Sequence, residues 1–203
     1  MGIVFATLLS CYAATTPIAA PARPALHLQL PMLFTDNMVL QQNANIPIWG
    51  TAHPYGLVVV ELDKATKETK VSSNGHWRVD LPALSASGPY ELRVIGADTI
   101  AIKNVMVGEV WLCSGQSNMA WPLAALDTAF GTSQEITRAN FANLRIFDVG
   151  HVTSAAPLQI GNGSGWKICS PTTIASFSAV AYFFGKNLHE KLGVPIGRMS
   201  ILM

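Results

Sequence analysis

The sequence predicts a β-sandwich over residues 26–106, followed by the beginning of an α/β domain with a parallel sheet over residues 107–203. In the first part, short runs of β-branched residues are separated by turn residues at intervals typical of a sandwich. From Val107 the pattern changes to continuously apolar strands and one long amphipathic helix. The 203 residues, 50% of them hydrophobic, suffice for one full domain, or for a small domain and part of another.

Four strands are predicted within the first part. Leu57–Leu62 is strongly β-branched, and His76–Leu81 alternates polar and apolar residues. The Asn74-Gly75 pair just before His76 is a strong hairpin-turn signal. Tyr90–Ile95 alternates again, and Thr99–Lys103 adds another strand.

The second part should contain parallel strands and a covering helix. Val110–Cys113 is continuously apolar, which predicts a strand buried on both faces, with Trp111 in the core. Leu144–Val149 predicts a second strand, and Val194–Met203 the start of a third. Between them a helix is expected over 175–192, ended by Gly193. Its apolar residues recur at helical spacing: Phe177, Val180, Ala181, Phe184, Leu188 and Leu192.

Composition restricts the partners and the location. Charged residues make up 12% of the chain and the net charge is +1, so no nucleic-acid or acidic-surface partner is indicated. No apolar run reaches the roughly 18 to 20 residues of a transmembrane helix. Residues 1–25 resemble a signal segment, with an apolar centre and a small-residue stretch, although the basic residues that should precede them are missing. We therefore expect export to the periplasm or the extracellular space, with lipid attachment at Cys11 as an alternative.

A serine follows the first apolar strand of the second part. Ser117 stands in Ser-Gly-Gln-Ser-Asn, where a parallel sheet presents ligand-binding residues beyond the carboxyl end of a strand. Gly115 permits a sharp turn, and the first N–H groups of a following helix would stabilise an oxyanion. Gln116 and Asn118 either orient the turn or contact a substrate hydroxyl, or they satisfy loop backbone groups. Met119 occupies the place of the second glycine of the G-x-S-x-G elbow, so the α/β-hydrolase motif is not matched.

The string Gly-Glu-Val-Trp-Leu-Cys-Ser-Gly-Gln-Ser-Asn-Met, residues 108–119, resembles the nucleophile block of the sialate O-acetylesterase family. These proteins are SGNH hydrolases, serine esterases that remove acetyl groups from sugars. Agreement with the family ends at Arg198, where a strand leading to a Trp-Gly-Gly-Thr-like turn would be expected. Further blocks that look like the family are residues 33–41, 166–171, 177–185 and 193–197.

The resemblance implies a flavodoxin-like SGNH-hydrolase domain, incomplete over residues 107–203. It makes Ser117 the nucleophile, with its own backbone N–H as one oxyanion donor. It also implies an O-acetylated carbohydrate substrate and neither cofactor nor metal. In the family's order, the oxyanion Gly and Asn and the late Asp-x-x-His lie beyond residue 203. The catalytic His and Asp are therefore expected to be absent from this chain.

The chain's own histidines supply no convincing base. Asp148-Val-Gly-His151 fits Asp-x-x-His but comes far too early for the catalytic block, so we expect His151 not to act as the base. The other four show no metal-site spacing: His27, His53, His76 and His189.

Two questions stay open at this stage. Cys113 and Cys169 either pair in an oxidising compartment, or Cys113 is a small buried hydrophobe. The first possible function is that of a sugar O-acetylesterase, with little activity from this chain alone. The second is that of a carbohydrate-binding or interaction β-sandwich module. In the third alternative the chain is a non-functional truncated product.

Overall fold

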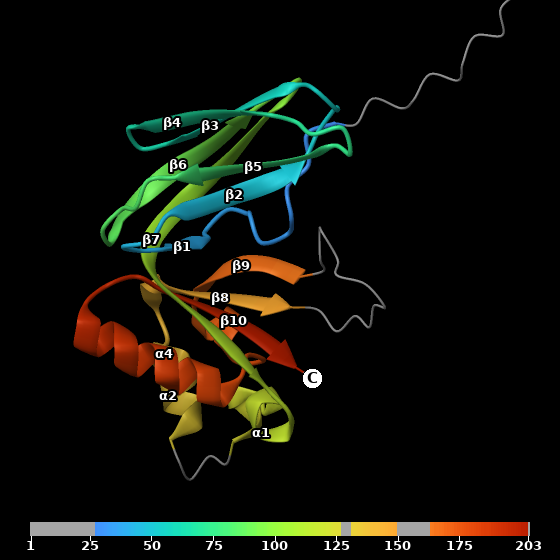
Figure 1. Cartoon of the computed structure of the whole chain (residues 1–203). Helices are drawn as coiled ribbons and strands as arrows, with labels where there is room; N and C mark the ends of the chain where they lie inside the picture. Colours follow the sequence, from blue (N-terminus) through green and yellow to red (C-terminus); the bar gives the residue numbers. More distant parts are fainter. Residues whose placement is uncertain (1–26, 127–130, 150–162, 203) are drawn as a thin grey trace, which may run out of the picture.

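The computed structural model describes residues 27–126, 131–149 and 163–202. The predicted signal segment, Cys11 and His151 lie outside these residues. Figure 1 shows a β-rich half above a half that combines strands with helices. The strands are β1 (Val39–Gln41), β2 (Ile46–Thr51), β3 (Leu57–Leu62), β4 (Ala65–Lys70), β5 (His76–Leu81), β6 (Ser87–Ile95), β7 (Thr99–Gly115), β8 (Phe141–Val149), β9 (Gly163–Cys169) and β10 (Ile196–Leu202). The helices are α1 (Ser117–Ala120), the 3-10 turn η1 (Leu123–Ala125), α2 (Thr132–Arg138), α3 (Pro171–Ile174) and α4 (Ala179–Leu192).

One strand links the two halves. A mixed sheet has the order β4-β3-β6-β7-β10-β8-β9, and β1 also joins β7, in parallel. The first part of β7 pairs antiparallel with β6, and its last seven residues, Glu109–Gly115, pair in parallel with β10. The 17 residues of β7 thus continue through residue 106, where the domain boundary is predicted. The division into two domains stays a prediction.

The upper half packs the two-stranded antiparallel ribbon β2–β5 over the strands β3 and β6. Leu57–Leu62 and His76–Leu81 are confirmed as strands with the predicted bounds, whereas β6 begins three residues earlier than predicted. The prediction of a hairpin at Asn74-Gly75 is wrong. Gly75 does adopt a turn conformation with φ of 85°, but β5 pairs with β2, not with β4. The core between the two layers includes Ile46, Ile48, Val58, Val60, Leu62, Trp77, Val79, Leu81, Leu92 and Val94.

The lower half confirms the expected parallel strands and helix. β10 lies between β7 and β8 and is parallel to both. α4 begins at Ala179, later than predicted, because Ser178 caps it by accepting a hydrogen bond from the Ala181 N–H. Gly193 ends it as predicted, with φ of 67° and its N–H donating to the carbonyl of His189. No helix within the described residues is long and apolar enough to cross a membrane.

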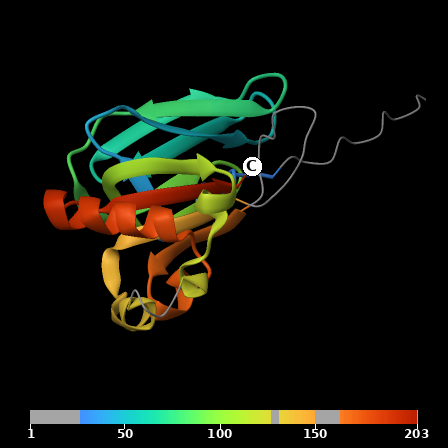
Figure 2. The ribbon, with the colours of Figure 1, turned by 90° about the horizontal axis from the view of Figure 1, so that it is seen from below.

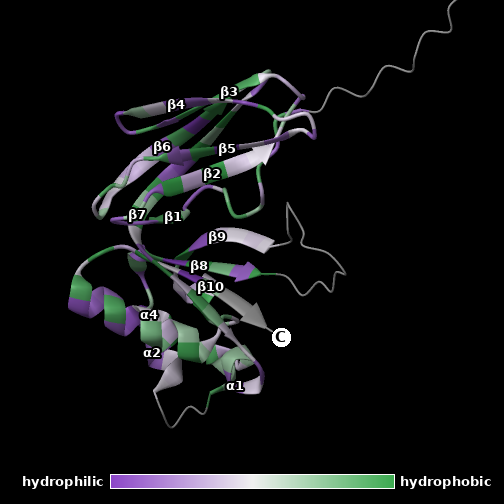
Figure 3. Ribbon diagram, in the orientation of Figure 1, coloured by the Kyte–Doolittle hydropathy of each residue, from purple (hydrophilic) through white to green (hydrophobic). Residues whose placement is uncertain are grey.

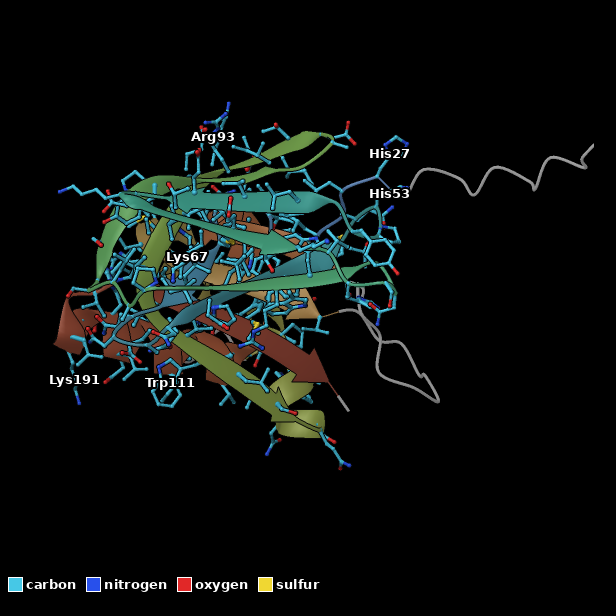
Figure 4. All side chains as sticks on the ribbon, turned by 45° about the horizontal axis from the view of Figure 1, so that its top comes forward. His27, His53, Lys67, Arg93, Trp111 and Lys191 are labelled. Atoms are coloured by element: carbon cyan, nitrogen blue, oxygen red, sulfur yellow. The ribbon has the colours of Figure 1, made fainter. Side chains whose placement is uncertain are left out.

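The predicted burial of Val110–Cys113 on both faces, with Trp111 in the core, is wrong. Trp111 is 41% exposed and Leu112 57% exposed, because β10 alone among the described strands pairs with the end of β7, which is an edge strand there. Figure 4 shows Trp111 pointing outward. On α4, Val180, Phe184 and Leu192, which belong to the predicted helical spacing, are exposed. The helix instead turns its small residues and one tyrosine to the sheet: Ala179, Ala181, Tyr182 and Gly185.

Candidate active site

The structure places Ser117 at the carboxyl edge of the parallel strands. β7 ends at Gly115, and Ser117 is the first residue of α1, with an exposed side chain. Leu202, the last residue of β10, pairs with Gly115, so both strands end at this edge. Figure 2 shows α1 and the end of β10 at the same side of the molecule. The location beyond a strand end is the one that the sequence predicts.

Gly115 avoids a close contact with α1 and does not adopt an unusual dihedral angle. It is not among the glycines with positive φ, but a Cβ atom added there would lie 3.1 Å from the Cβ of Met119. A side chain at this position would therefore press on α1. The turn brings the serine close to the end of the strand, because only Gln116 stands between Gly115 and the first residue of α1.

Gln116 and Asn118 have exposed side chains on either side of Ser117. Gln116 occupies the N-cap position without a side-chain cap, and neither side chain bonds to a described residue. The alternative that they satisfy loop backbone groups is therefore not what the structure has. Both remain available to a ligand at the edge of the sheet.

Residues at the beginning of α4 hold the turn that follows Ser117 in place through hydrogen bonds. Ser178 donates from its Oγ to the sulfur of Met119, 3.4 Å away, while it caps α4. The Ala179 N–H donates to the Trp121 carbonyl at 2.9 Å, and the Leu123 N–H to the Phe177 carbonyl at 2.9 Å. α1 is a single turn without a buried residue, so these contacts are what hold it in place.

No base accompanies the serine among the described residues. His189 lies in the last turn of α4, away from α1, and its Nδ1 is 2.8 Å from the Val194 carbonyl. Asp148 is exposed near the end of β8, separated from β7 by β10, and its predicted companion His151 lies outside the described residues. No group of three or more His, Cys, Asp or Glu side chains in the described ranges could hold a metal ion.

Arg198 is a buried charge that the sequence patterns did not predict. Its side chain is fully buried between β10 and α4, where Nη1 donates to the Ala181 carbonyl. The guanidinium carbon lies 5.2 Å from the centre of the Phe177 ring, and Nε and Nη2 have no hydrogen-bond partner. Burial lowers the pKa of Arg198 to about 10. The only sequence signal was that the family pattern stops at this residue.

Cys113 and Cys169 are both buried free thiols near Arg198. Burial raises the pKa of each, and the guanidinium opposes that shift. A buried thiol with a raised pKa is a poor nucleophile at neutral pH. Cys113 therefore packs as a small hydrophobe, whereas the Ser117 side chain is exposed at this edge.

A mixed sheet with parallel strands and helices packed on it fits an α/β hydrolase-like fold, and an exposed serine follows the first of those strands. No protein-family model matches the chain. The chain is 32% identical to the sialate O-acetylesterase of Mus musculus, over 82% of this chain and 34% of that protein. It is 29% identical to the sialate O-acetylesterase of Homo sapiens, over 81% of this chain and 35% of that protein.

A solved structure extends the likeness to the fold. A carbohydrate acetylesterase from Xanthomonas citri superposes with a TM-score of 0.82 at 39% identity, covering 87% of this chain and 40% of that protein. The predicted resemblance is thus confirmed, and the chain is related to the sialate O-acetylesterases. It spans about a third of the length of these curated relatives.

Proposed function

We propose that this chain carries the nucleophile of a serine esterase that removes O-acetyl groups from sugars. The observation that carries the proposal is the exposed Ser117, held at the carboxyl edge of the parallel sheet within the block that resembles the family. The relatives named as sialate O-acetylesterases and as a carbohydrate acetylesterase support the reaction and the substrate class.

In the proposed reaction, the Ser117 Oγ attacks the carbonyl carbon of the acetyl ester. The carbonyl electron pair moves onto oxygen, and the Ser117 backbone N–H donates to that oxyanion. The intermediate collapses as the bond to the sugar oxygen breaks, and that oxygen takes the serine's proton through a base. Water then adds to the acetyl-enzyme, and acetate leaves with the serine restored. No cofactor or metal takes part.

The base is the part of this mechanism that the described residues do not supply. No histidine among them lies beside Ser117, and a serine hydroxyl is a weak nucleophile without one. We therefore propose that these 203 residues alone have little or no esterase activity. The alternatives, a carbohydrate-binding or interaction module and a non-functional product, would share that inactivity.

Two further proposals concern the architecture and location. Residues 26–106 would form a β-sandwich unit, supported by the two layers of strands that share one core. The protein would be exported, supported by the apolar segment and small residues within positions 1–25. Protease protection of the mature chain in fractionated cells would test the second of these.

A chimaera tests the esterase proposal directly. In it, this chain replaces the matching 40% of the Xanthomonas citri acetylesterase, which supplies the remainder of a hydrolase. We expect the folded chimaera to release acetate from acetylated oligosaccharides. Ser117→Ala should lower turnover at least about a thousandfold. Ser114→Ala, which alters an exposed serine three residues earlier, on β7, is the matched control.

The outcomes separate the proposals. A folded chimaera whose turnover survives Ser117→Ala would contradict the role of this serine. Acetate release by the 203 residues alone, abolished by Ser117→Ala, would instead show that a base lies within them.

A further inference from the structure

A depression lies on the outward face of the β2–β5 ribbon. Its volume is about 280 Å³, and it is lined by Trp49, Gly50, His76, Trp77 and Arg78. In Figure 1 the ribbon faces the viewer in the upper half, whereas α1, which begins at Ser117, lies at the foot of the molecule. The depression therefore belongs to a different region from the candidate active site.

The pairing of the two strands creates the depression. Trp49 lies directly opposite Arg78, and Thr51 directly opposite His76, on the outward face of the ribbon. Between these pairs Gly50 lies opposite Trp77, whose side chain is buried in the core. Since alternate residues of a strand point to opposite faces, the middle pair leaves a gap between two outward pairs.

The walls of the depression combine a fixed aromatic ring with polar groups. The Trp49 ring packs against the Phe34 ring in a T-shaped arrangement, with ring centres 4.7 Å apart. This contact fixes the orientation of the Trp49 ring. Arg78 donates from Nη2 and Nε to the carboxylate of Asp80, at 2.8 and 3.1 Å. This pair leaves Arg78 Nη1 and the His76 ring without a partner among the described residues.

These groups favour a neutral ligand rich in hydroxyl groups. The Arg78 and Asp80 charges cancel, so a phosphate or another anion would find no unpaired cation in the pair. A hydroxyl group both donates and accepts, which suits a guanidinium beside a carboxylate, and an indole face offers apolar surface to the C–H side of a sugar ring. A site of few polar groups around an aromatic wall is typical of small-molecule recognition.

We propose that this depression binds one sugar residue of a neutral oligosaccharide, stacked on Trp49 and hydrogen-bonded by Arg78, whose charge Asp80 balances. The site does not depend on acetyl groups or on Ser117, so it rests on no step of the proposed reaction. Its effect would be to hold a glycan chain on the protein independently of any chemistry at the sheet edge.

Calorimetric titration of the full chain with unacetylated cellohexaose, xylohexaose and mannohexaose tests the proposal. We expect at least one of them to bind. Arg78→Ala should weaken that binding about tenfold, and Trp49→Ala at least as much. Arg93→Ala is the matched control, because Arg93 is also exposed and ion-paired, 3.0 Å from Glu61, but projects from the sheet on the other side of the core (Figure 4). Ser117→Ala should bind like the wild type.

Each other outcome counts against the site. Absence of binding by all three hexasaccharides at millimolar concentration would overturn it. Binding that is unchanged in Arg78→Ala, which removes a side chain that is 63% exposed, would place the saccharide elsewhere. Equal losses in Arg78→Ala and Arg93→Ala would show a general surface effect. Loss of binding in Ser117→Ala would assign the saccharide to the candidate active site.

Discussion

The upper half of this protein buries its large apolar side chains more completely than the lower half does. The upper half packs two layers of strands around one core, and its large exposed hydrophobic residues are only Met32, Tyr55 and Leu57 among those described. In the lower half the described residues that are large, apolar and exposed are Trp111, Leu112, Trp121, Val180, Phe183, Phe184 and Leu192. Figure 3 shows apolar colour along α4, on the outside of the sheet.

The difference follows from the layers available to each sheet. In the upper half both strand layers turn their alternate residues to each other, so each covers the other. In the lower half α4 covers one face of the parallel strands, but no described element covers the outer side of α4 or the free edge of β7. Trp111 and Phe184, whose ring centres are 5.2 Å apart, cover each other only in part. An exposed apolar surface of this kind marks an interaction site or favours association.

The largest effect should come from a pair of leucine variants that measures this difference. Leu92→Ala removes a fully buried side chain from the upper core and should lower the free energy of unfolding by about 2–5 kcal/mol. Leu192→Ala, at the 52% exposed end of α4, should cost less than about 1 kcal/mol. Urea denaturation of both variants measures the two losses. Equal losses would mean that the lower half is packed as tightly as the upper one.

A smaller effect, of opposite sign, is expected at Arg198. Replacing it with leucine removes a buried charge with two unbonded nitrogens and should raise the free energy of unfolding by about 1–3 kcal/mol. The folded-state pKa, about 10, lies below the ordinary value of 12.5, so the unfolded chain binds more protons between these values. The destabilisation by the buried Arg198 charge is thus complete below pH 10. Above pH 10, the difference in unfolding free energy between Arg198→Leu and the wild type should become smaller.

Thermal unfolding of the wild type and Arg198→Leu at neutral pH and above pH 10 checks both statements. A variant that is less stable at neutral pH would mean that the guanidinium, with its Ala181 and Phe177 contacts, stabilises the lower half. Arg138→Leu, which removes an exposed arginine from α2, is the control for loss of charge alone.

The smallest effect concerns a polar group of the lower half that does find partners. Glu135 on α2 accepts hydrogen bonds from Lys186 and Tyr182 on α4, the first at 2.6 Å. Burial acts to raise the pKa of Glu135, but these two donors outweigh it and the pKa is lowered. Its contribution to stability should be full above the ordinary value of 4.5 and be lost as the pH falls through the lower folded-state value.

Glu135→Gln should therefore lower stability at neutral pH by about 0.5–1 kcal/mol, and the difference from the wild type should shrink below pH 4.5. Chemical denaturation over this pH range measures it. Glu190→Gln, on the exposed side of α4, should leave the profile unchanged. A difference that persists unchanged in acid would rule out ionisation of Glu135 as its source.

The elements that could be predicted are those with local causes. Leu57–Leu62 and His76–Leu81 carry their own alternation and turn signals, and Gly193 ends α4 through a conformation that favours glycine. The partner of β5 was missed, because a turn signal such as Asn74-Gly75 fixes the local bend but not which distant strand completes the ladder. The depression beside Trp49 was missed for the same reason: Trp49 and Arg78 meet only through that pairing.

For the candidate site, the sequence by itself pointed to the serine, since the string from Gly108 to Met119 resembles the family's nucleophile block whatever surrounds it. It also determined that the parallel strands and α4 exist, because hydrophobic spacing is a property of the chain. Only the tertiary structure decided burial. Trp111 is exposed and Arg198 is buried, contrary to the pattern of apolar and polar residues, because burial depends on which neighbouring layer covers each face of the sheet.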